Sequence, residues 1–174
     1  MILLLTFTVL VFLFFLLLAV LVFLLPIIRG APFVPSHYKI VEEMVSLANI
    51  KRGMKVADLG SGDGRIVIAL AEAGAEVHGY EINPILVWWA RRNIRRKKLS
   101  SKAFIHWGSF WRYNLASFDV ITVFGINHIM KSLEKKLKRE LKKNARVVSN
   151  VFTFPNWPHS QKIGRVYIYE RSSL

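Results

Sequence analysis

The stretch that decides the fold is "VADLGSGDGR", residues 56–65, in which three glycines alternate with Ser61 and Asp63 after a short apolar run. A glycine-rich turn at the end of a buried strand lets a ligand approach the backbone closely. Turns of this kind often bind phosphate at the start of a helix. This one also carries two carboxylates, Asp58 and Asp63, so the chemistry of its ligand has to be argued.

Apolar strand patterns alternate with helical patterns on both sides of this loop. Helices are predicted at residues 36–48, 65–74, 84–98 and 128–143, and strands at 54–60, 76–82, 102–107, 118–125, 145–154 and 164–170. Ser36 and Asn83 are expected to cap the first and third helices. The alternation predicts an α/β domain with a Rossmann-like, mostly parallel sheet flanked by helices. Ligands of such sheets bind outside the carboxyl ends of the strands, where the glycine loop lies.

The loop favours a cationic ligand over a phosphate. A dinucleotide-binding G-x-G-x-x-G pattern would need glycine where Arg65 stands, and no Lys-Ser or Lys-Thr follows, which excludes a P-loop. Asp58 and Asp63 would repel a pyrophosphate in a partly desolvated cleft. S-adenosylmethionine carries a sulfonium and an ammonium, and loop N–H groups could bind its carboxylate. Glu81 ends the next strand, where a carboxylate can accept both ribose hydroxyls. The alternative is that Asp58 and Asp63 are turn residues and Glu81 a surface charge.

The N-terminus predicts a membrane anchor. No charged side chain occurs from Ile2 to Ile28, and a helix of that length, roughly 40 Å, can span a hydrocarbon core. A cleaved signal peptide or a buried core helix are the alternatives. We therefore expect an anchor over residues 1–28 and a folded domain over 29–174. Every Lys and Arg lies at or after Arg29, and the net charge is +14, which predicts a single-pass topology with the domain on the cytoplasmic side, or the matrix side if mitochondrial.

The motifs resemble those of a known family. "VADLGSGDGR" with "YEINP" is similar to motif I and the acidic motif of seven-strand, class I methyltransferases. "PFVPS" (32–36), "VFGIN" (123–127) and "RVVSNVFTFPNW" (146–157) resemble the membrane-anchored protein-lysine methyltransferases. Mitochondrial members of that group modify the ATP synthase c-subunit and the adenine nucleotide translocator. The resemblance covers residues 32 to about 170. Only one strand clearly follows "FPNW" in this sequence, so we expect the C-terminal strands to be shortened relative to the usual terminal hairpin.

The resemblance also implies roles for individual residues. The methionine part of S-adenosylmethionine would be surrounded by Asp58, Gly60, Ser61, Gly62 and Asp63, its ribose held by Glu81, and its adenine by the loop at Ser109 and Phe110. Ser109 stands where the superfamily often has Asp. Pro35 and Ser36 would close over the methionine end, and Asn127 would face the reacting centre.

Lysine methylation needs a neutral amine, although free lysine has a pKa near 10.4. An apolar aromatic channel would desolvate the amine and lower its pKa, and aromatic faces tolerate a cationic product. The candidates for this channel are Phe152, Phe154 and Trp157, with Phe33 and Phe124 as further ones; core packing is the alternative. Asn127 could position the amine. No metal is expected.

The basic surface of "RRNIRRKK" and of residues 131–143 has two interpretations. Beside a membrane anchor, it predicts attraction to anionic lipids. Together with nearby tryptophans, it could bind nucleic acid. The predicted activity is methylation of a lysine in a membrane or membrane-associated protein. An RNA, DNA or small-molecule methyltransferase of the same fold, or a non-catalytic S-adenosylmethionine-binding membrane protein, are the alternatives.

Overall fold

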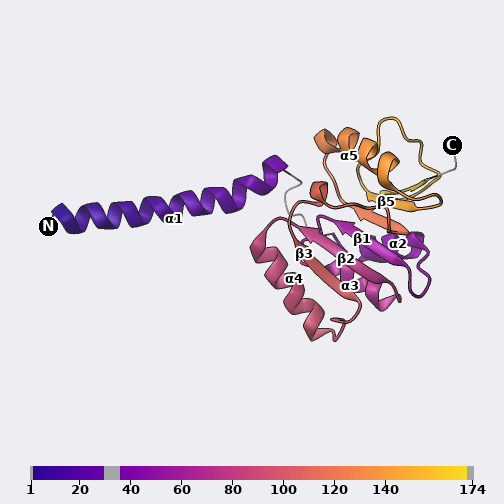
Figure 1. Cartoon of the computed structure of the whole chain (residues 1–174), viewed down its shortest axis with the longest axis horizontal. Coiled ribbons are helices and arrows are strands. Elements are labelled where there is room, and N and C mark those ends of the chain that lie inside the picture. The colour runs from indigo at the N-terminus through magenta and orange to yellow at the C-terminus, as the bar shows by residue number, and fades with distance from the viewer. Residues whose placement is uncertain (1, 30–35, 172–174) are drawn as a thin grey trace.

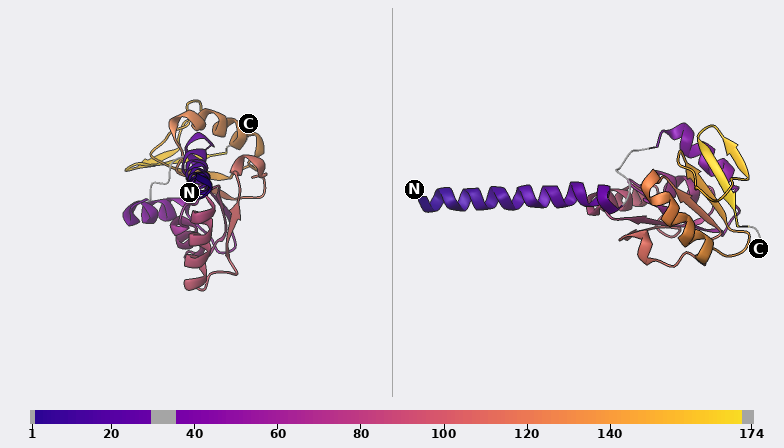
Figure 2. Two further views of the ribbon diagram at one scale, coloured as in Figure 1. Left: turned by 90° about the vertical axis from the view of Figure 1, so that its left-hand side faces the viewer. Right: turned by 90° about the horizontal axis from the view of Figure 1, so that it is seen from above.

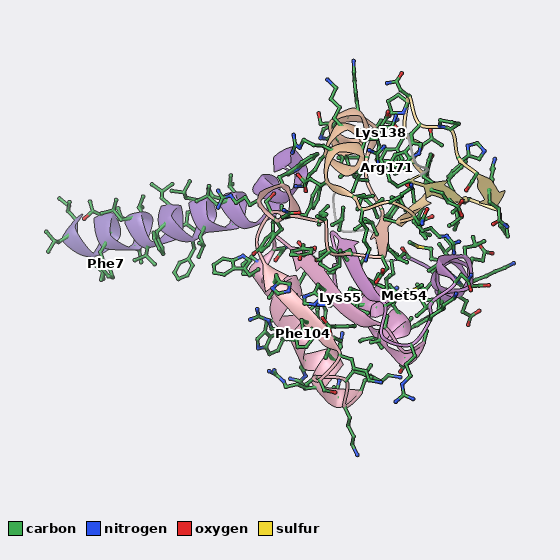
Figure 3. The ribbon with its side chains drawn as sticks, turned by 45° about the vertical axis from the view of Figure 1, so that its right-hand side comes forward. Phe7, Met54, Lys55, Phe104, Lys138 and Arg171 are labelled. Atoms are coloured by element: carbon green, nitrogen blue, oxygen red, sulfur yellow. The ribbon has the colours of Figure 1, made fainter. Side chains whose placement is uncertain are left out.

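A long N-terminal helix projects from an α/β domain (Figure 1). The computed structural model describes residues 2–29 and 36–171, with side chains described for 2–21 and 36–171. Helix α1 covers Ile2–Arg29. Its stretch Ile2–Leu21 has a mean hydropathy of 3.0 and none of it is buried, so it is long and apolar enough to cross a membrane. Phe7 accordingly projects from α1 well away from the domain (Figure 3).

The domain is built on a seven-stranded sheet in the order β3-β2-β1-β4-β5-β7-β6. The strands are β1 Lys55–Leu59, β2 Glu76–Glu81, β3 Ala103–Trp107, β4 Val120–Val123, β5 Arg146–Asn150, β6 Gln161–Ile163 and β7 Val166–Glu170. The first five are parallel to one another, and β7 is antiparallel to both β5 and β6. The strand order reverses between β1 and β4, which is where this architecture opens a crevice for a ligand.

Helices cover both faces of the sheet (Figures 1 and 2). They are α2 Tyr38–Ala48, α3 Arg65–Glu72, α4 Pro84–Arg96, α5 Asn127–Glu140 and the short 3-10 helix η1 Phe110–Arg112. Buried side chains of α2, α3 and α4 share one core with Val56 and Val77. Those of α5 share the other core with Ala57 and Leu59. Successive residues of β1 therefore face opposite cores, as the pleat of a strand requires.

One predicted helix cap is confirmed and one is wrong. The Asn83 side chain accepts hydrogen bonds from the N–H groups of Ile85 and Leu86, which caps α4. The N-cap of α2 is His37 and not Ser36, and it makes no side-chain capping bond. Ser36 is instead buried next to the domain core, with 7% of its surface exposed. The residue that precedes the cap of α2 therefore has a tertiary contact, described below, in place of a local one.

The C-terminal end of the sheet differs from the sequence-based expectation. Strand β5 ends at Asn150 and not at residue 154, because Val151 adopts a positive φ of 69°. The N–H of Phe152 donates to the carbonyl of Asn150, which closes a tight turn around Val151. A hairpin of β6 and β7 then follows, so the expectation of one clear strand missed β6, whereas the expectation of shortened C-terminal strands is confirmed. Strand β6 has only three residues, all exposed, so no apolar alternation announced it.

Candidate cofactor and active site

The candidate site lies at the carboxyl ends of β1, β2 and β4, where the glycine loop crosses from β1 to α3. Gly60 and Gly64 have φ values of 86° and 82°, which favour glycine. A Cβ on Gly64 would lie 3.0 Å from the Cβ of Ala90 in α4. The loop therefore needs glycine both for its backbone conformation and for the close packing of α4 against it.

Asp58 is a buried carboxylate with one oxygen left unpaired. Its side chain lies on β1 with 2% of the residue exposed, and its Oδ1 accepts a 2.7 Å hydrogen bond from the hydroxyl of Thr122 on β4. Its Oδ2 has no partner among the described residues. Burial, and to a smaller extent the charges of Glu81 and Asp63, raise the pKa of Asp58 to about 7, against the Thr122 bond. A buried carboxylate with a free oxygen is a group that a cation stabilises in its ionised form.

Glu81 ends β2 and ties the glycine loop to α4. It is 8% exposed. Its Oε2 accepts from the N–H of Gly62 at 3.0 Å and its Oε1 from the N–H of Asn83 at 2.8 Å. Burial raises its pKa, and the backbone N–H donors partly oppose that shift. Because each carboxylate oxygen can accept more than one hydrogen bond, Glu81 can still accept from ligand hydroxyls.

Most N–H groups of the glycine loop are already used inside the protein. Gly60 and Ser61 both donate to the carbonyl of Tyr80, at 3.0 and 3.1 Å. Gly62 donates to Glu81, and Gly64 donates to the carbonyl of Ser61 at 2.9 Å. These four donors already have partners inside the protein, and the contact of loop N–H groups with a ligand carboxylate stays a prediction. These donors hold the loop against β2, which sets the position of Glu81.

Asp63, predicted to lie beside the methionine part of the cofactor, is paired within the protein. Its carboxylate accepts from the guanidinium of Arg65, with a closest distance of 2.7 Å. The Nη1 of Arg65 donates to the carbonyl of Ser36, also at 2.7 Å. Arg65 therefore joins the glycine loop to the segment that precedes α2. The cation-attracting charge of the site consequently rests on Asp58 and Glu81.

The loop after β3 is close to Glu81, as the predicted adenine position requires. The N–H of Gly108 donates to the carbonyl of Glu81 at 2.9 Å. Ser109 is half-buried at the N-cap of η1 and makes no side-chain capping bond. Phe110 is 8% exposed and packs in the core, with Trp111 beside it. The Ser109 hydroxyl therefore caps no N–H group of η1, and its contact with adenine stays a prediction.

The aromatic residues of "FPNW" lie in the core. Phe154 and Trp157 are 4% and 8% exposed, and both pack against Tyr169, with ring centroids 4.7 and 5.6 Å away. This placement favours packing over the predicted substrate channel. Phe124 and Phe152 are only half-buried, and their ring centroids lie 5.9 Å apart at the carboxyl ends of β4 and β5. This second pair is the one with surface left for a substrate.

The loop that carries Trp157 is held to α5 by two charged side chains. Glu134 Oε2 accepts from the N–H of Asn156 at 2.8 Å, and Lys138 Nζ donates to the carbonyl of the same residue at 2.7 Å. Lys138 also pairs with Glu134 and lies 5.6 Å from the Trp157 ring centre. Figure 3 shows Lys138 on the outer side of the molecule, above the strands. At least one lysine of α5, Lys138, therefore serves to hold the loop after β5 in place.

Asn127 is exposed and begins α5, shortly after β4. Pro35 lies outside the described residues. Sequence reasoning missed Thr122 and Arg65, whose partners are 64 and 29 residues away. It also missed Asn150, which is 1% exposed at the end of β5 and has an unpartnered Oδ1. The only signal in the sequence for a role of Asn150 is its place in "RVVSNVFTF", beside the predicted site.

The donor set of the site suits S-adenosylmethionine. The free Oδ2 of Asp58 faces no partner in the described part of the chain and matches a cationic ligand, and Glu81 matches a ribose. Within residues 2–29 and 36–171, no cluster of His, Asp or Glu with metal-binding geometry is present.

Comparison with known proteins identifies the class. A solved RNA methyltransferase from Salinibacter ruber, in complex with S-adenosyl-L-homocysteine, superposes with a TM-score of 0.78 at 28% identity, covering 81% of this chain and 95% of that one. The fold is that of a class I, S-adenosylmethionine-dependent methyltransferase. The model of the ANTKMT methyltransferase domain matches residues 58–161, and the chain belongs to that family.

Two curated relatives carry more specific names. The human lysine N-methyltransferase of the ATP synthase c-subunit is 38% identical over 158 residues, which cover 87% of this chain and 67% of the human protein. The adenine nucleotide translocase lysine N-methyltransferase of Mus musculus is 37% identical over 150 residues, which cover 83% of this chain and 65% of the mouse protein. Both names describe enzymes that methylate a lysine of another protein, the ATP synthase c-subunit in one case and the adenine nucleotide translocase in the other.

Proposed function

We propose that this enzyme is a membrane-anchored protein-lysine N-methyltransferase that acts on a lysine of a membrane or membrane-associated protein. The names of the two curated relatives support a lysine acceptor. The apolar helix α1 supports an anchor, and the absence of Lys and Arg before Arg29 supports a domain on the cytoplasmic side, or the matrix side of a mitochondrial membrane. In this proposal residues 1–28 are the anchor and 29–174 the methyltransferase domain.

The observation that carries the proposal is the short tether between anchor and site. Residues 30–35 connect α1 to Ser36, and a chain of that length spans at most about 25 Å. Ser36 is itself bound to Arg65, beside the glycine loop. The methyl-transfer site is therefore held within a short distance of the bilayer surface, where a lysine at the membrane boundary can reach it.

When bound, S-adenosylmethionine supplies a methyl group on a sulfonium, which a neutral amine can displace. Asp58, ionised in the presence of that cation, would stabilise its charge, because buried charges of opposite sign interact strongly. Glu81 would accept from the ribose hydroxyls. The half-buried rings of Phe124 and Phe152 would desolvate the incoming lysine and favour its neutral form.

The remaining predicted residues have supporting roles in this proposal. Pro35 and Ser36 would cover the methionine end, and Ser61 would line it. Ser109 and the backbone of Phe110 would contact adenine. Asn127, exposed at the start of α5, would position the amine through its side-chain carbonyl. Phe154 and Trp157 would not contact the substrate; their buried rings would hold the loop after β5 in place.

The test uses the full chain in lipid vesicles with methyl-labelled S-adenosylmethionine and a membrane extract. The expected result is label in protein, lost on protease treatment and located on lysine by mass spectrometry. The matched control is the Asp58→Ala variant, which should transfer little label. Label that survives protease and is lost with nuclease would instead assign an RNA substrate, the kind named for the Salinibacter enzyme. Binding of S-adenosylmethionine without transfer to any fraction would contradict an enzymatic role.

A further inference from the structure

A group of large apolar side chains is exposed on one side of the domain. Trp88, Trp89 and Ile85 of α4 are 56%, 51% and 53% exposed, and Trp107 and Phe104 of β3 are 65% and 37% exposed. We call Ile85, Trp88, Trp89 and Trp107 the tryptophan face, whereas Phe104 points to the opposite face of β3, where its ring centre lies 5.1 Å from that of His78. Scattered apolar residues on a surface are ordinary, but a contiguous group of this kind marks an interaction site.

The four residues of the tryptophan face come together because the end of β3 is bonded to the start of α4. Ile85, Trp88 and Trp89 follow the i, i+3, i+4 spacing and share one side of α4. The Nε1 of Trp107 donates to the carbonyl of Ile82, just before α4 begins. Phe104, labelled on β3 in Figure 3, lies between Ala103 and Ile105, which pack in the core with α4, so its side chain faces away from that helix.

Positive charge surrounds this face. Arg91, Arg92, Arg95 and Arg96 all belong to α4 and are all exposed, and the helix contains no Asp or Glu. The guanidinium of Arg92 lies 5.7 Å from the Trp88 ring centre. Two of the arginines, Arg91 and Arg95, line an open pocket of about 440 Å³ with Phe104 and His106. Tryptophan beside arginine suits the boundary of a bilayer, where the rings lie at headgroup depth and the guanidinium groups meet lipid phosphates.

The position of the face relates it to the anchor and to the site. Trp107 closely precedes the loop that holds Ser109, and Ile85 follows Glu81 by four residues, so the face borders the carboxyl end of the sheet. Figures 1 and 2 show α1 extending away from the domain on the side where α4 lies. The tether of residues 30–35 keeps that end of the domain near the bilayer whatever the angle of α1.

We infer that the tryptophan face docks the domain onto an anionic bilayer surface and so turns the site toward the membrane. This inference rests on the membrane anchoring in the proposed function and deepens it, because an anchor alone limits distance but not orientation. Two observations favour lipid as the partner. The face lies on the side of the domain from which the candidate span α1 extends, and α4 contains no acidic side chain to pair with its arginines. A single-stranded RNA could also stack on tryptophans beside arginine, and it is included below as an outcome.

The experiment uses tryptophan fluorescence of the full chain reconstituted in vesicles. All 5 tryptophans lie in the domain and none in α1, so their emission does not report on the anchor. With brominated lipids as quenchers, the docked face should give quenched, blue-shifted emission in vesicles containing phosphatidylserine. In phosphatidylcholine vesicles the anchored domain should remain largely unquenched.

A matched pair of variants tests the surface itself. Arg92→Gln/Arg96→Gln removes two charges from α4 and leaves the tryptophans in place as reporters. It should lower the ratio of docked to undocked protein by about fivefold for each arginine. Lys131→Gln/Lys135→Gln removes two exposed charges from α5 and should leave the quenching unchanged. Equal quenching in the two kinds of vesicle, or an equal loss of quenching in the two variants, would overturn the inference.

Two further outcomes keep the inference separate from the proposed function. If an RNA oligonucleotide shifts the emission and anionic vesicles do not, the face binds nucleic acid and the inference is wrong. Lysine labelling is measured on the same samples. Labelling without docking would overturn this inference alone, whereas docking without lysine labelling would contradict the proposed function and leave the surface assignment standing.

Discussion

At the scale of single residues, the site depends on two carboxylates whose surroundings differ. Asp58 is buried with Oδ2 unpaired, whereas both oxygens of Glu81 already accept backbone N–H groups. Asp58 therefore has an oxygen available to a cationic ligand, whereas Glu81 already stabilises the glycine loop before any ligand binds. A substitution at either position removes more than a ligand contact, and the two should have different signatures.

Asp58→Asn should stabilise the free enzyme at alkaline pH. With its pKa raised from 3.8 to about 7, the native Asp58 holds its proton over a range in which the unfolded chain has lost it. Stability therefore falls as pH rises from 4 to 7, by an amount on the order of 2–4 kcal/mol. The variant lacks this loss, so its melting temperature should exceed that of the wild type at pH 8 and be similar at pH 4. Thermal melts across this range, without cofactor, check the sign.

The same substitution should weaken cofactor binding in a pH-dependent manner. A cation prefers ionised Asp58, so wild-type affinity for S-adenosylmethionine should increase from pH 6 to pH 8. Asp58→Asn should bind on the order of tenfold or more weakly at pH 8, since a shift of one pKa unit corresponds to about 1.4 kcal/mol. Calorimetry at several pH values measures both, and an unchanged pH slope in the variant would show that another group is responsible.

Glu81→Gln should cost stability as well as affinity. A glutamine offers one acceptor oxygen, so one of the N–H groups of Gly62 and Asn83 would face an NH₂ group. An unsatisfied buried donor costs about 1–3 kcal/mol. We expect a lower denaturation midpoint in the free enzyme, along with weaker S-adenosylmethionine binding. Denaturant titration of the apo protein separates these effects; a midpoint equal to that of the wild type would argue that Glu81 contacts only the ligand.

At the scale of elements, Arg65 couples the first helix of the domain to the glycine loop. It is the first residue of α3, yet its guanidinium reaches Asp63 and the carbonyl of Ser36 together. His37 provides no side-chain cap, so the start of α2 depends on this contact. The position of the segment next to the tether is therefore set by a side chain from another element.

Arg65→Lys should loosen the start of α2. Lysine keeps the charge but lacks the planar fork that serves two partners, so we expect a loss of roughly 1–2 kcal/mol. Amide hydrogen exchange should accelerate at residues 38–41 and remain unchanged in β1. Arg52→Lys, at an exposed position, is the control. Unchanged exchange at the start of α2 would show that packing of Val41 and Met44 holds the helix without Arg65.

At the scale of the whole molecule, the proposed function makes methylation depend on the length of the segment between α1 and the domain. Inserting a flexible Gly/Ser segment of about 20 residues between Gly30 and Pro35 would widen the volume that the domain can explore. The proposed function predicts unchanged S-adenosylmethionine affinity and slower methylation of a membrane-embedded lysine, because the effective concentration of the site falls. A soluble lysine peptide, used as the control substrate, should be methylated at the original rate. Unchanged rates on both substrates would show that the tether length is irrelevant.

The sequence by itself determined the elements and the region of the site. An uncharged apolar run, alternating helical and strand patterns and the glycines of residues 60–64 act through near neighbours in the chain, so they are readable without a structure. The rule that ligands bind at carboxyl ends of parallel strands then placed Asp58 and Glu81 at one edge. The sequence did not predict strand β6, because its three exposed residues show no alternation of apolar and polar side chains.

Only the tertiary structure decided the state of each group in that site. The ionisation of Asp58 depends on burial and on Thr122, which is 64 residues away in the chain. The pairing of Asp63, the engagement of the loop N–H groups and the core positions of Phe154 and Trp157 likewise depend on contacts that the folded chain creates. The tryptophan face exists because α4 packs beside β3. Burial and hydrogen bonding are set by neighbours in space, and the local pattern of a sequence does not contain them.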